Sequence, residues 1–306
     1  MHSVRQSSCL ELVTTRNIYL AGGQLTGIVV LRSEKPIYCD TLKVTVEGLE
    51  VPAVSGGRRQ LPRQSVFFAR EKLIAGIELP HSAYEQFSLL WNTFLARVER
   101  RRISAGEHIY PFAIPIPASL PPSYSGSAGS ICYQISAQIK TFLARPVVVS
   151  KTVRIAALPR RKHSGPVNLM YPSPESSAKR APIEVNVVLE SPTLPLGDTF
   201  RGHLRVLNSD KINLGRVSAI LEVRECLRGP VVQEIHRQTA DEWVLENSAG
   251  HPELVEADFS LKVPSKAPPS LDGTFVSVSW IMKVRIDTEP PVELTSPVAV
   301  YTPLTE

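Results

Sequence analysis

The sequence has no long uninterrupted apolar stretch. Its apolar runs, such as residues 28–31 and 147–149, have the length of a β-strand, whereas a membrane-spanning helix requires roughly 20 apolar residues. Residues 1–13 carry polar and charged side chains throughout, so they lack the continuous apolar segment of a signal peptide. We therefore expect a cytoplasmic protein that does not cross a membrane.

Cysteine is scarce and scattered. The four cysteines are Cys9, Cys39, Cys132 and Cys226. Their spacing fits neither a zinc knuckle nor a redox pair, and a chain of 306 residues can bury a core without disulfide staples. We expect reduced thiols, no metal and no cofactor.

Motifs of catalysis are also missing from the sequence. The seven histidines show no i, i+4 pair and no metal-ligand spacing, and there is no nucleophile elbow. We therefore expect no catalytic residue and a protein that is not an enzyme. Catalysis by carboxylates that are distant in sequence but meet in space stays open as an alternative.

What the sequence has in quantity is period-two alternation of apolar and polar residues. The clearest examples are residues 42–47, 131–140, 183–189, 217–223, 259–263 and 276–286. Such alternation is typical of strands with one buried and one solvated face, and the 26 prolines suit turns and sheet edges. Because the length suits two domains, we predict an all-β chain of two tandem immunoglobulin-like antiparallel β-sandwiches.

One segment, residues 80–104, has helical periodicity instead. Its apolar stripe consists of Tyr84, Phe87, Trp91, Phe94, Leu95 and Val98. We predict one amphipathic helix here, in the first domain, whose stripe covers a sheet. The alternative is a face that binds a lipid or a partner. The basic residues of that face would be Arg97, Arg100, Arg101 and Arg102.

Residues 159–182 are rich in proline, serine and charge and show no sustained periodicity. We expect them to link a first domain, residues 1–158, to a second domain, residues 183–306. The linker begins with the basic residues Arg160, Arg161 and Lys162. These are candidate contacts for an anion, such as a phosphopeptide or a lipid headgroup, beside the alternative of a solvated loop. The net charge of +5 is modest, and we expect no nucleic-acid partner.

The two halves of the chain share a pattern of prolines and glycines as well as the period-two alternation. Residues 117–126 and residues 264–273 both read P-x-x-x-P-P-S-x-x-G. Pairs of glycines five positions apart occur at positions 22 and 27 and again at positions 197 and 202. Two copies of one sandwich explain both matches.

Three blocks of the sequence resemble the arrestin fold family. Residues 19–31 (YLAGGQLTGIVVL) resemble the opening strands of its N-terminal domain. Residues 104–123 resemble its G-x-H-x-x-P-F-x-x-x-x-P-x-x-L-P-x-S block, and residues 197–208 (GDTFRGHLRVLN) are similar to the start of its C-terminal domain. The resemblance implies an arrestin-like N-terminal β-sandwich followed by an arrestin-like C-terminal one.

The same resemblance implies a role as an adaptor that binds other proteins. The implied partners are membrane cargo, receptors or sorting machinery in protein transport, endocytosis or signalling, with peripheral contact to an anionic endosomal or plasma membrane. Two alternatives keep the fold and change the role. One is a structural subunit of a retromer-like coat, and the other is a bacterial sporulation-control-like regulator.

The resemblance also points to Arg154, which stands where receptor-binding arrestins have a phosphate-sensing arginine. In those arrestins a long loop of the second domain supplies the acidic partners of that arginine. Here only 30 positions separate Arg228 from Asp258, which leaves little room for such a loop. Arg154 is therefore a candidate anion contact, with an edge-strand charge as the alternative.

A second candidate is a PPxY sequence, the motif through which relatives recruit ubiquitin ligases by binding WW domains. The motif is matched by Pro121, Pro122 and Tyr124. The second copy of the repeat keeps the surrounding pattern but has Leu271 in place of the tyrosine. We therefore expect this stretch to serve the fold. The sequence given ends at Glu306 without a PPxY tail of the kind found in those relatives.

Overall fold

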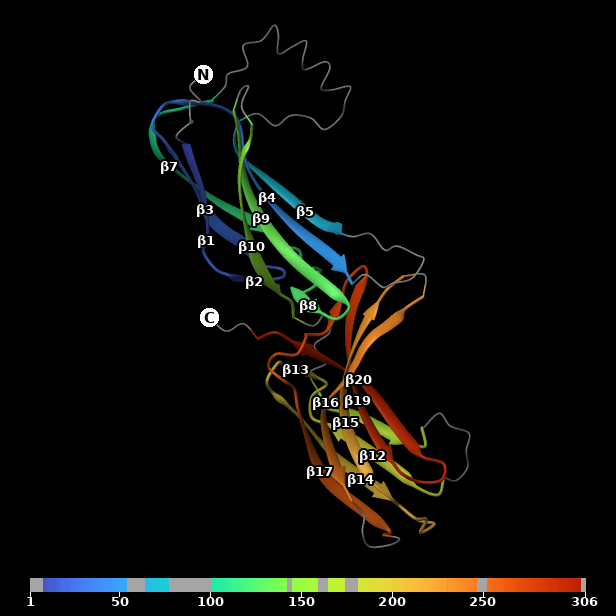
Figure 1. Cartoon of the computed structure of the whole chain (residues 1–306). Coiled ribbons are helices and arrows are strands. Elements are labelled where there is room, and N and C mark those ends of the chain that lie inside the picture. Colours follow the sequence, from blue (N-terminus) through green and yellow to red (C-terminus); the bar gives the residue numbers. More distant parts are fainter. Residues whose placement is uncertain are drawn as a thin grey trace. The chain divides into compact units, whose positions relative to one another are not determined.

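The computed structural model describes residues 8–53, 64–76, 101–141, 145–158, 165–173, 181–229, 231–246 and 252–303. In these ranges the regular secondary structure is β-strand, and none of it is helix (Figure 1). The strands are β1 (Ser8–Thr14), β2 (Ile18–Leu20), β3 (Gln24–Ser33), β4 (Ile37–Pro52), β5 (Ser65–Gly76), β6 (Arg101–Ile103), β7 (Gly106–Pro115), β8 (Tyr124–Gly126), β9 (Gly129–Thr141), β10 (Val147–Ala156), β11 (Val167–Tyr171), β12 (Glu184–Leu189), β13 (Thr193–Pro195), β14 (Thr199–Leu207), β15 (Val217–Leu227), β16 (Gln233–Leu245), β17 (Leu254–Lys262), β18 (Leu271–Asp272), β19 (Val276–Ile286) and β20 (Val292–Tyr301). A helix capable of crossing a bilayer is not found in the described ranges. The all-β prediction is confirmed.

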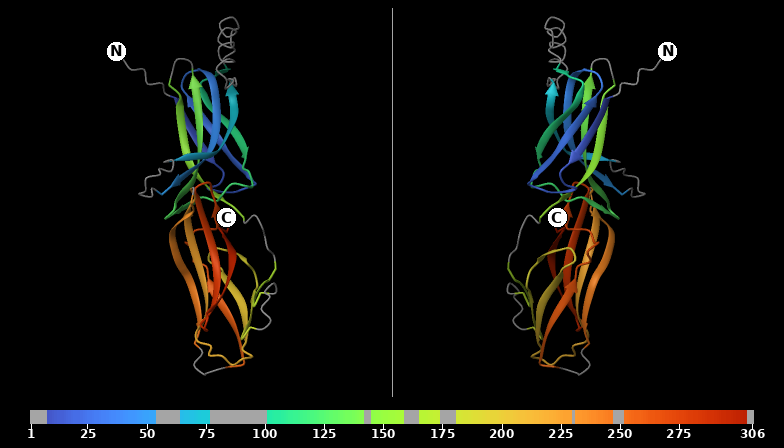
Figure 2. Two further views of the ribbon diagram at one scale, coloured as in Figure 1. Left: turned by 90° about the vertical axis from the view of Figure 1, so that its right-hand side faces the viewer. Right: turned by 90° about the vertical axis from the view of Figure 1, so that its left-hand side faces the viewer.

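The chain divides into two compact units, each of which carries two facing sheets (Figure 2). Unit 1 consists of Met1–Leu49, Ser65–Ala118 and Cys132–Ile155, and unit 2 consists of Glu50–Gln64, Ser119–Ile131 and Ala156–Glu306. Two β-sandwiches in tandem are therefore observed. Unit 2 also contains two short segments from the first half of the sequence.

Unit 1 is built on a three-stranded sheet, β1-β3-β7, and on a sheet with the order β2-β10-β9-β4-β5. Alternation along the strands turns every second side chain inward. The residues that become fully buried in this way include Leu25, Leu42, Val44, Tyr133 and Ile135. Removal of these apolar side chains from water is the main stabilising contribution to this core.

Unit 2 repeats the plan with the sheets β11-β12-β14-β17 and β13-β20-β19-β15-β16. Its most buried side chains include Phe200, Leu204, Leu221, Trp280 and Met282. The indole nitrogen of Trp280 donates to the carbonyl oxygen of Pro268 at 2.9 Å, so the one polar atom of this large side chain is satisfied in the core.

The two larger sheets share one strand order, in which β8 pairs with β9 as β18 pairs with β19. The glycines of the repeat also have matching geometry. Gly22 and Gly197 both have φ of 89°, a conformation that favours glycine. Their amides donate to Ile116 O at 3.0 Å and to Val263 O at 3.1 Å. The structure thus agrees with two copies of one sandwich.

The other glycine of each pair lies beneath an aromatic ring. A Cβ atom on Gly27 would come within 2.6 Å of the ring of Phe112, and one on Gly202 would clash in the same way with the ring of Phe259. Only glycine leaves room for this close approach, because any larger residue would displace a buried ring.

The predicted helix over residues 80–104 lies mostly outside the described residues. Its last part is described, and there the prediction is wrong, because Arg101 and Arg102 belong to the strand β6. This strand pairs with β4, with Ile103 opposite Ile37. Ile103 is buried in that pairing, so tertiary contacts outweigh the helical pattern at this end.

Residues 165–173, within the expected linker, are also part of a sheet. Strand β11 pairs with β12, with Val167 opposite Leu189 and Tyr171 opposite Val185. The strand has only five residues between proline-rich segments, and Met170 interrupts the alternation of apolar and polar residues, so the sequence signal is weak. The segment 159–182 is therefore not irregular throughout.

Candidate interaction sites

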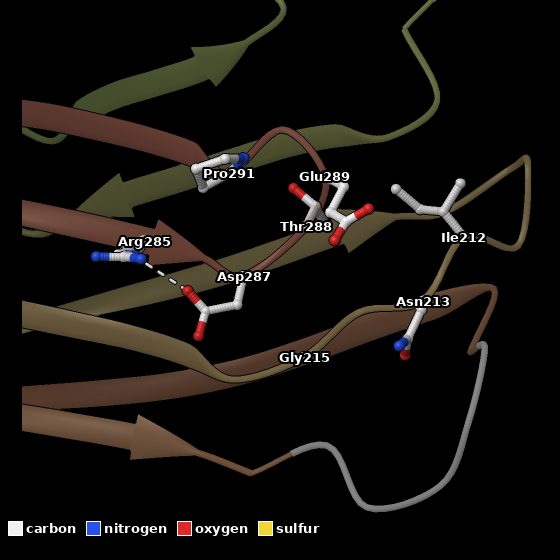
Figure 3. Close-up of a pocket in the computed structure, with 8 residues that line it drawn as sticks. All are labelled: Ile212, Asn213, Gly215, Arg285, Asp287, Thr288, Glu289 and Pro291. Atoms are coloured by element: carbon white, nitrogen blue, oxygen red, sulfur yellow. Dashed lines mark hydrogen bonds and ion pairs between the residues drawn. The ribbon is translucent and has the colours of Figure 1, made fainter.

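A pocket of about 640 Å³ lies in unit 2 between residues 212–215 and the turn after β19 (Figure 3). Asn208, which is fully buried, shapes one wall. Its Nδ2 donates to Ile212 O at 2.9 Å, and its Oδ1 accepts from Ile212 N at 3.0 Å. The other wall is held by the amide of Gly215, which donates to Asp287 O at 2.9 Å. The side chain of Asn208 therefore holds one wall of this pocket, and a backbone hydrogen bond holds the other.

The side chains of the pocket are polar but already partly paired. Arg285 donates from Nε to Asp287 Oδ1 at 3.0 Å, as Figure 3 shows, and Thr288 donates to Pro290 O at 2.7 Å. Glu289 is exposed on the same turn. Among the described residues, no group of three or more histidine, cysteine, aspartate or glutamate side chains could hold a metal ion. The pocket offers hydrogen-bonding groups and no catalytic constellation.

Unit 2 contains two buried carboxylates at positions that are equivalent in the repeat, and the first is Glu225. Glu225, on β15, is only 5% exposed. Its Oε2 accepts from the hydroxyl of Tyr124, from Ser127 N at 2.7 Å and from Ala128 N at 3.3 Å. Burial raises the pKa of Tyr124, and its hydrogen bond to Glu225 raises it further, so Tyr124 stays a neutral donor.

Glu50, near the end of β4, occupies the second position and is fully buried. Its carboxylate accepts from Thr274 N at 3.0 Å, from Phe275 N at 2.8 Å and from Val276 N at 2.7 Å. Three backbone donors satisfy a charge that would otherwise be very costly to bury.

The two carboxylates have equivalent places in the repeat. Each stands two positions before the end of its strand, β4 or β15. Glu50 binds the turn after Gly273, and Glu225 binds the turn after Gly126. These two glycines end the two copies of the P-x-x-x-P-P-S-x-x-G block. The sequence contained a signal for both. Glu50 and Glu225 continue the buried phases Leu42–Val44–Val46 and Val217–Ala219–Leu221–Val223, where an acidic residue breaks an apolar pattern.

The outer faces of the two smaller sheets differ at two pairs of positions that match in the repeat. On β14 and β17 of unit 2, His203 lies 2.8 Å from Asp258 and Arg205 lies 3.2 Å from Glu256. The matching positions on β3 and β7 are apolar. There the facing pairs are Ile28–Pro111 and Val30–Ile109.

Some apolar residues of this face in unit 1 are open to solvent, whereas Val30 is buried. Ile109 is 56% exposed, and Val13, which faces Ile28 from β1, is 40% exposed. We call the residues Val13, Ile28, Val30, Ile109 and Pro111 the apolar face. At its rim, Arg32 pairs with Glu11 at 3.0 Å and with Glu107 at 2.6 Å.

Arg154 lies on β10 with its side chain exposed. Its amide donates to Asn17 O at 3.0 Å, so the segment that leads into β2 covers the strand edge at this point. Within the described ranges, the Arg154 side chain has no ion pair. Lys151, on the same strand, donates from Nζ to Thr14 Oγ1 at 2.9 Å.

Residues 10–158 match the family model of the arrestin (or S-antigen) N-terminal domain. This part of the chain is therefore an N-terminal domain of the arrestin-fold family. A comparison with curated proteins finds no match. Arrestin-fold proteins are in general non-enzymatic adaptors that bind other proteins. The arrestin range includes β8 and the turn after it, which unit 2 contains.

Within the arrestin domain the candidate residues have different environments. Pro122 and Tyr124 are buried and Pro121 is half-buried, whereas Arg102 and Arg154 are exposed. Five other candidates lie outside the described residues: Arg97, Arg100, Arg160, Arg161 and Lys162. The structure does not gather the described candidates into one site.

Proposed function

We propose that this arrestin-fold chain is an adaptor that binds other proteins, namely membrane cargo, receptors or sorting machinery in trafficking or signalling. The main support is the apolar face. Ile109 is exposed at the position where unit 2 has Glu256 in an ion pair with Arg205, and Val13 is exposed on the neighbouring strand β1. Exposed apolar side chains grouped within a charged rim are typical of surfaces that bind a protein partner.

The test is a pair of matched variants in affinity purification with proximity labelling in the native host. Ile109→Glu places a charge in the apolar face. Leu254→Glu places one on the outer face of the sheet in unit 2, where Leu254 is 45% exposed. We expect Ile109→Glu to lose membrane cargo or sorting proteins that the wild type and Leu254→Glu both recover. The same partner set for all three chains would contradict the proposal.

We further propose that Arg154 contacts an anionic group of the partner. Its exposed guanidinium has no ion pair in the described part of the chain, so it is available to a phosphate or carboxylate. We also propose that residues 183–306 are an arrestin-like C-terminal domain. The shared strand order of the two larger sheets supports this assignment.

A structural subunit of a sorting or coat complex is the second candidate, and the same apolar face supports it. In a permanent complex such a face would always be covered, whereas a transient adaptor leaves it open. The native mass of the endogenous protein separates the two, because a structural subunit would be found only in a complex of fixed composition.

A further inference from the structure

The two buried carboxylates are connected by backbone hydrogen bonds. Glu225 accepts from the amide of Ala128, and the carbonyl oxygen of Ala128 accepts from Ala53 N at 2.8 Å. Ala53 lies three residues after Glu50. One side of the Glu225 site is therefore bonded to the segment that carries Glu50.

A second connection closes the circuit. Glu50 accepts from Phe275 N at 2.8 Å, and Phe275 O accepts from Arg228 N at 2.6 Å. Arg228 lies three residues after Glu225, where it also forms an ion pair with Asp272. We call this closed circuit, through residues 50–53, 124–129, 225–228 and 272–276, the carboxylate ring. All four segments belong to unit 2.

Glycines keep the ring tightly packed. A Cβ atom on Gly126 would clash with the Glu225 carboxylate, and one on Gly273 would lie 2.6 Å from Glu50 Oε1. The same atom would lie 3.1 Å from Cδ1 of Ile131, whose register partner is Tyr124. Side-chain packing thus joins the two turns by a second route, so neither turn can move without disturbing the other.

We propose that the carboxylate ring is a conformational latch in unit 2, in which Glu225 and Glu50 hold the turns 124–129 and 272–276 as one cooperative element. Loss of either carboxylate releases both turns together. Release also uncovers Tyr124 and Pro122. This inference is independent of the proposed function, since it concerns how unit 2 opens and not which partner it binds.

Amide hydrogen exchange in the full chain tests the latch. We expect Glu225→Gln to accelerate exchange about tenfold or more at Ser127 and Ala128, because it removes a charged acceptor. We expect a similar acceleration at Thr274, Phe275 and Val276, which Glu225 does not touch. Glu50→Gln should produce the same pattern from the other side.

Glu222→Gln is the matched control. Glu222 lies on the same strand as Glu225, is only 8% exposed, and pairs with Lys283 at 2.8 Å and Arg224 at 3.1 Å, but it is not part of the ring. Its loss should leave exchange at both turns within about twofold of wild type.

Two independent effects would overturn the proposal. If Glu225→Gln accelerates only the turn 124–129 and Glu50→Gln only the turn 272–276, the ring is not a single latch. Should Glu225→Gln unfold the chain, exchange will rise at every amide, and Tyr124→Phe then decides the question. This variant removes one hydroxyl, and acceleration confined to its own turn would equally contradict coupling.

Discussion

Replacement of Tyr124 should affect the stability of the protein and leave its affinity for WW domains unchanged. Tyr124 is 5% exposed and donates its hydroxyl to the buried carboxylate of Glu225. Tyr124→Phe removes one hydrogen bond to a charged group, a loss of about 1.5–3 kcal/mol. Tyr124→Ala also removes a buried ring, and truncations of this kind cost about 3–5 kcal/mol.

For a unit of this size, 1 kcal/mol corresponds to roughly 2–4 °C in melting temperature. Tyr124→Phe should therefore melt about 3–12 °C below wild type, and Tyr124→Ala about 6–20 °C below it. Calorimetry of the full chain measures both shifts, and titration with a purified WW domain measures affinity. We expect no WW binding by the folded wild type, because a ligand tyrosine must be exposed and extended. Wild-type melting of Tyr124→Ala together with loss of a WW affinity present in wild type would refute this reasoning.

Three further predictions concern other parts of the molecule. Gly27→Ala, and likewise Gly202→Ala, should lower the free energy of unfolding by about 1–3 kcal/mol, because each added methyl group meets a buried ring; a melt in which either variant matches wild type would contradict this. Burial alone would raise the pKa of Glu222, but hydrogen bonds to Lys283 and Arg224 lower this pKa overall. The Glu222 carboxylate therefore stabilises the folded protein at pH values above its unfolded-state pKa. This contribution is lost as the pH falls through the lower folded-state pKa. Melting temperatures between about pH 5 and pH 3 should consequently fall less steeply for Glu222→Gln than for wild type. Arg154→Glu should keep the free energy of unfolding within about 0.5 kcal/mol and weaken binding of an acidic phosphopeptide in calorimetry, whereas unchanged affinity would remove Arg154 from the partner site.

The strands and their repetition could be predicted from the sequence because both depend on local patterns. Alternation at residues 276–286 is long and is interrupted only by the apolar Ile281, so β19 follows directly from it. The glycines at positions 27 and 202 stand out because a strand interior rarely tolerates glycine unless another group approaches closely. Strand β11 has only five residues, whose alternation is interrupted by Met170. At residues 101–103 a helical pattern competes with pairing to β4.

The contacts that build the carboxylate ring could not be predicted, because they join residues far apart in sequence. Glu50 and Glu225 each interrupt an apolar phase, which indicates a buried acid but not its donors. Those donors are mostly backbone amides, which carry no residue identity. Likewise, the contrast between the outer faces requires the register that sets Ile109 opposite Val30 and Glu256 opposite Arg205.

The difference between the two repeat copies gives Tyr124 a role. Glu50 receives three backbone amides, from Thr274, Phe275 and Val276. Among the described residues, Glu225 receives two backbone amides, from Ser127 and Ala128, and its third donor is the hydroxyl of Tyr124.

In the second copy the position of Tyr124 is taken by Leu271, an apolar residue that supplies no donor. There the amide of Val276 completes the set of three. A buried carboxylate must have its lone pairs satisfied by hydrogen-bond donors. Glu225, which has two amide donors, therefore requires a polar side chain at position 124, whereas Glu50, which has three, requires none at position 271. The tyrosine that completes the PPxY letters is thus accounted for by the needs of Glu225, without a WW domain. A swap tests this argument: Leu271→Tyr should add no stability, since Glu50 already has its three donors, whereas Tyr124→Leu should destabilise the protein at least as much as Tyr124→Phe.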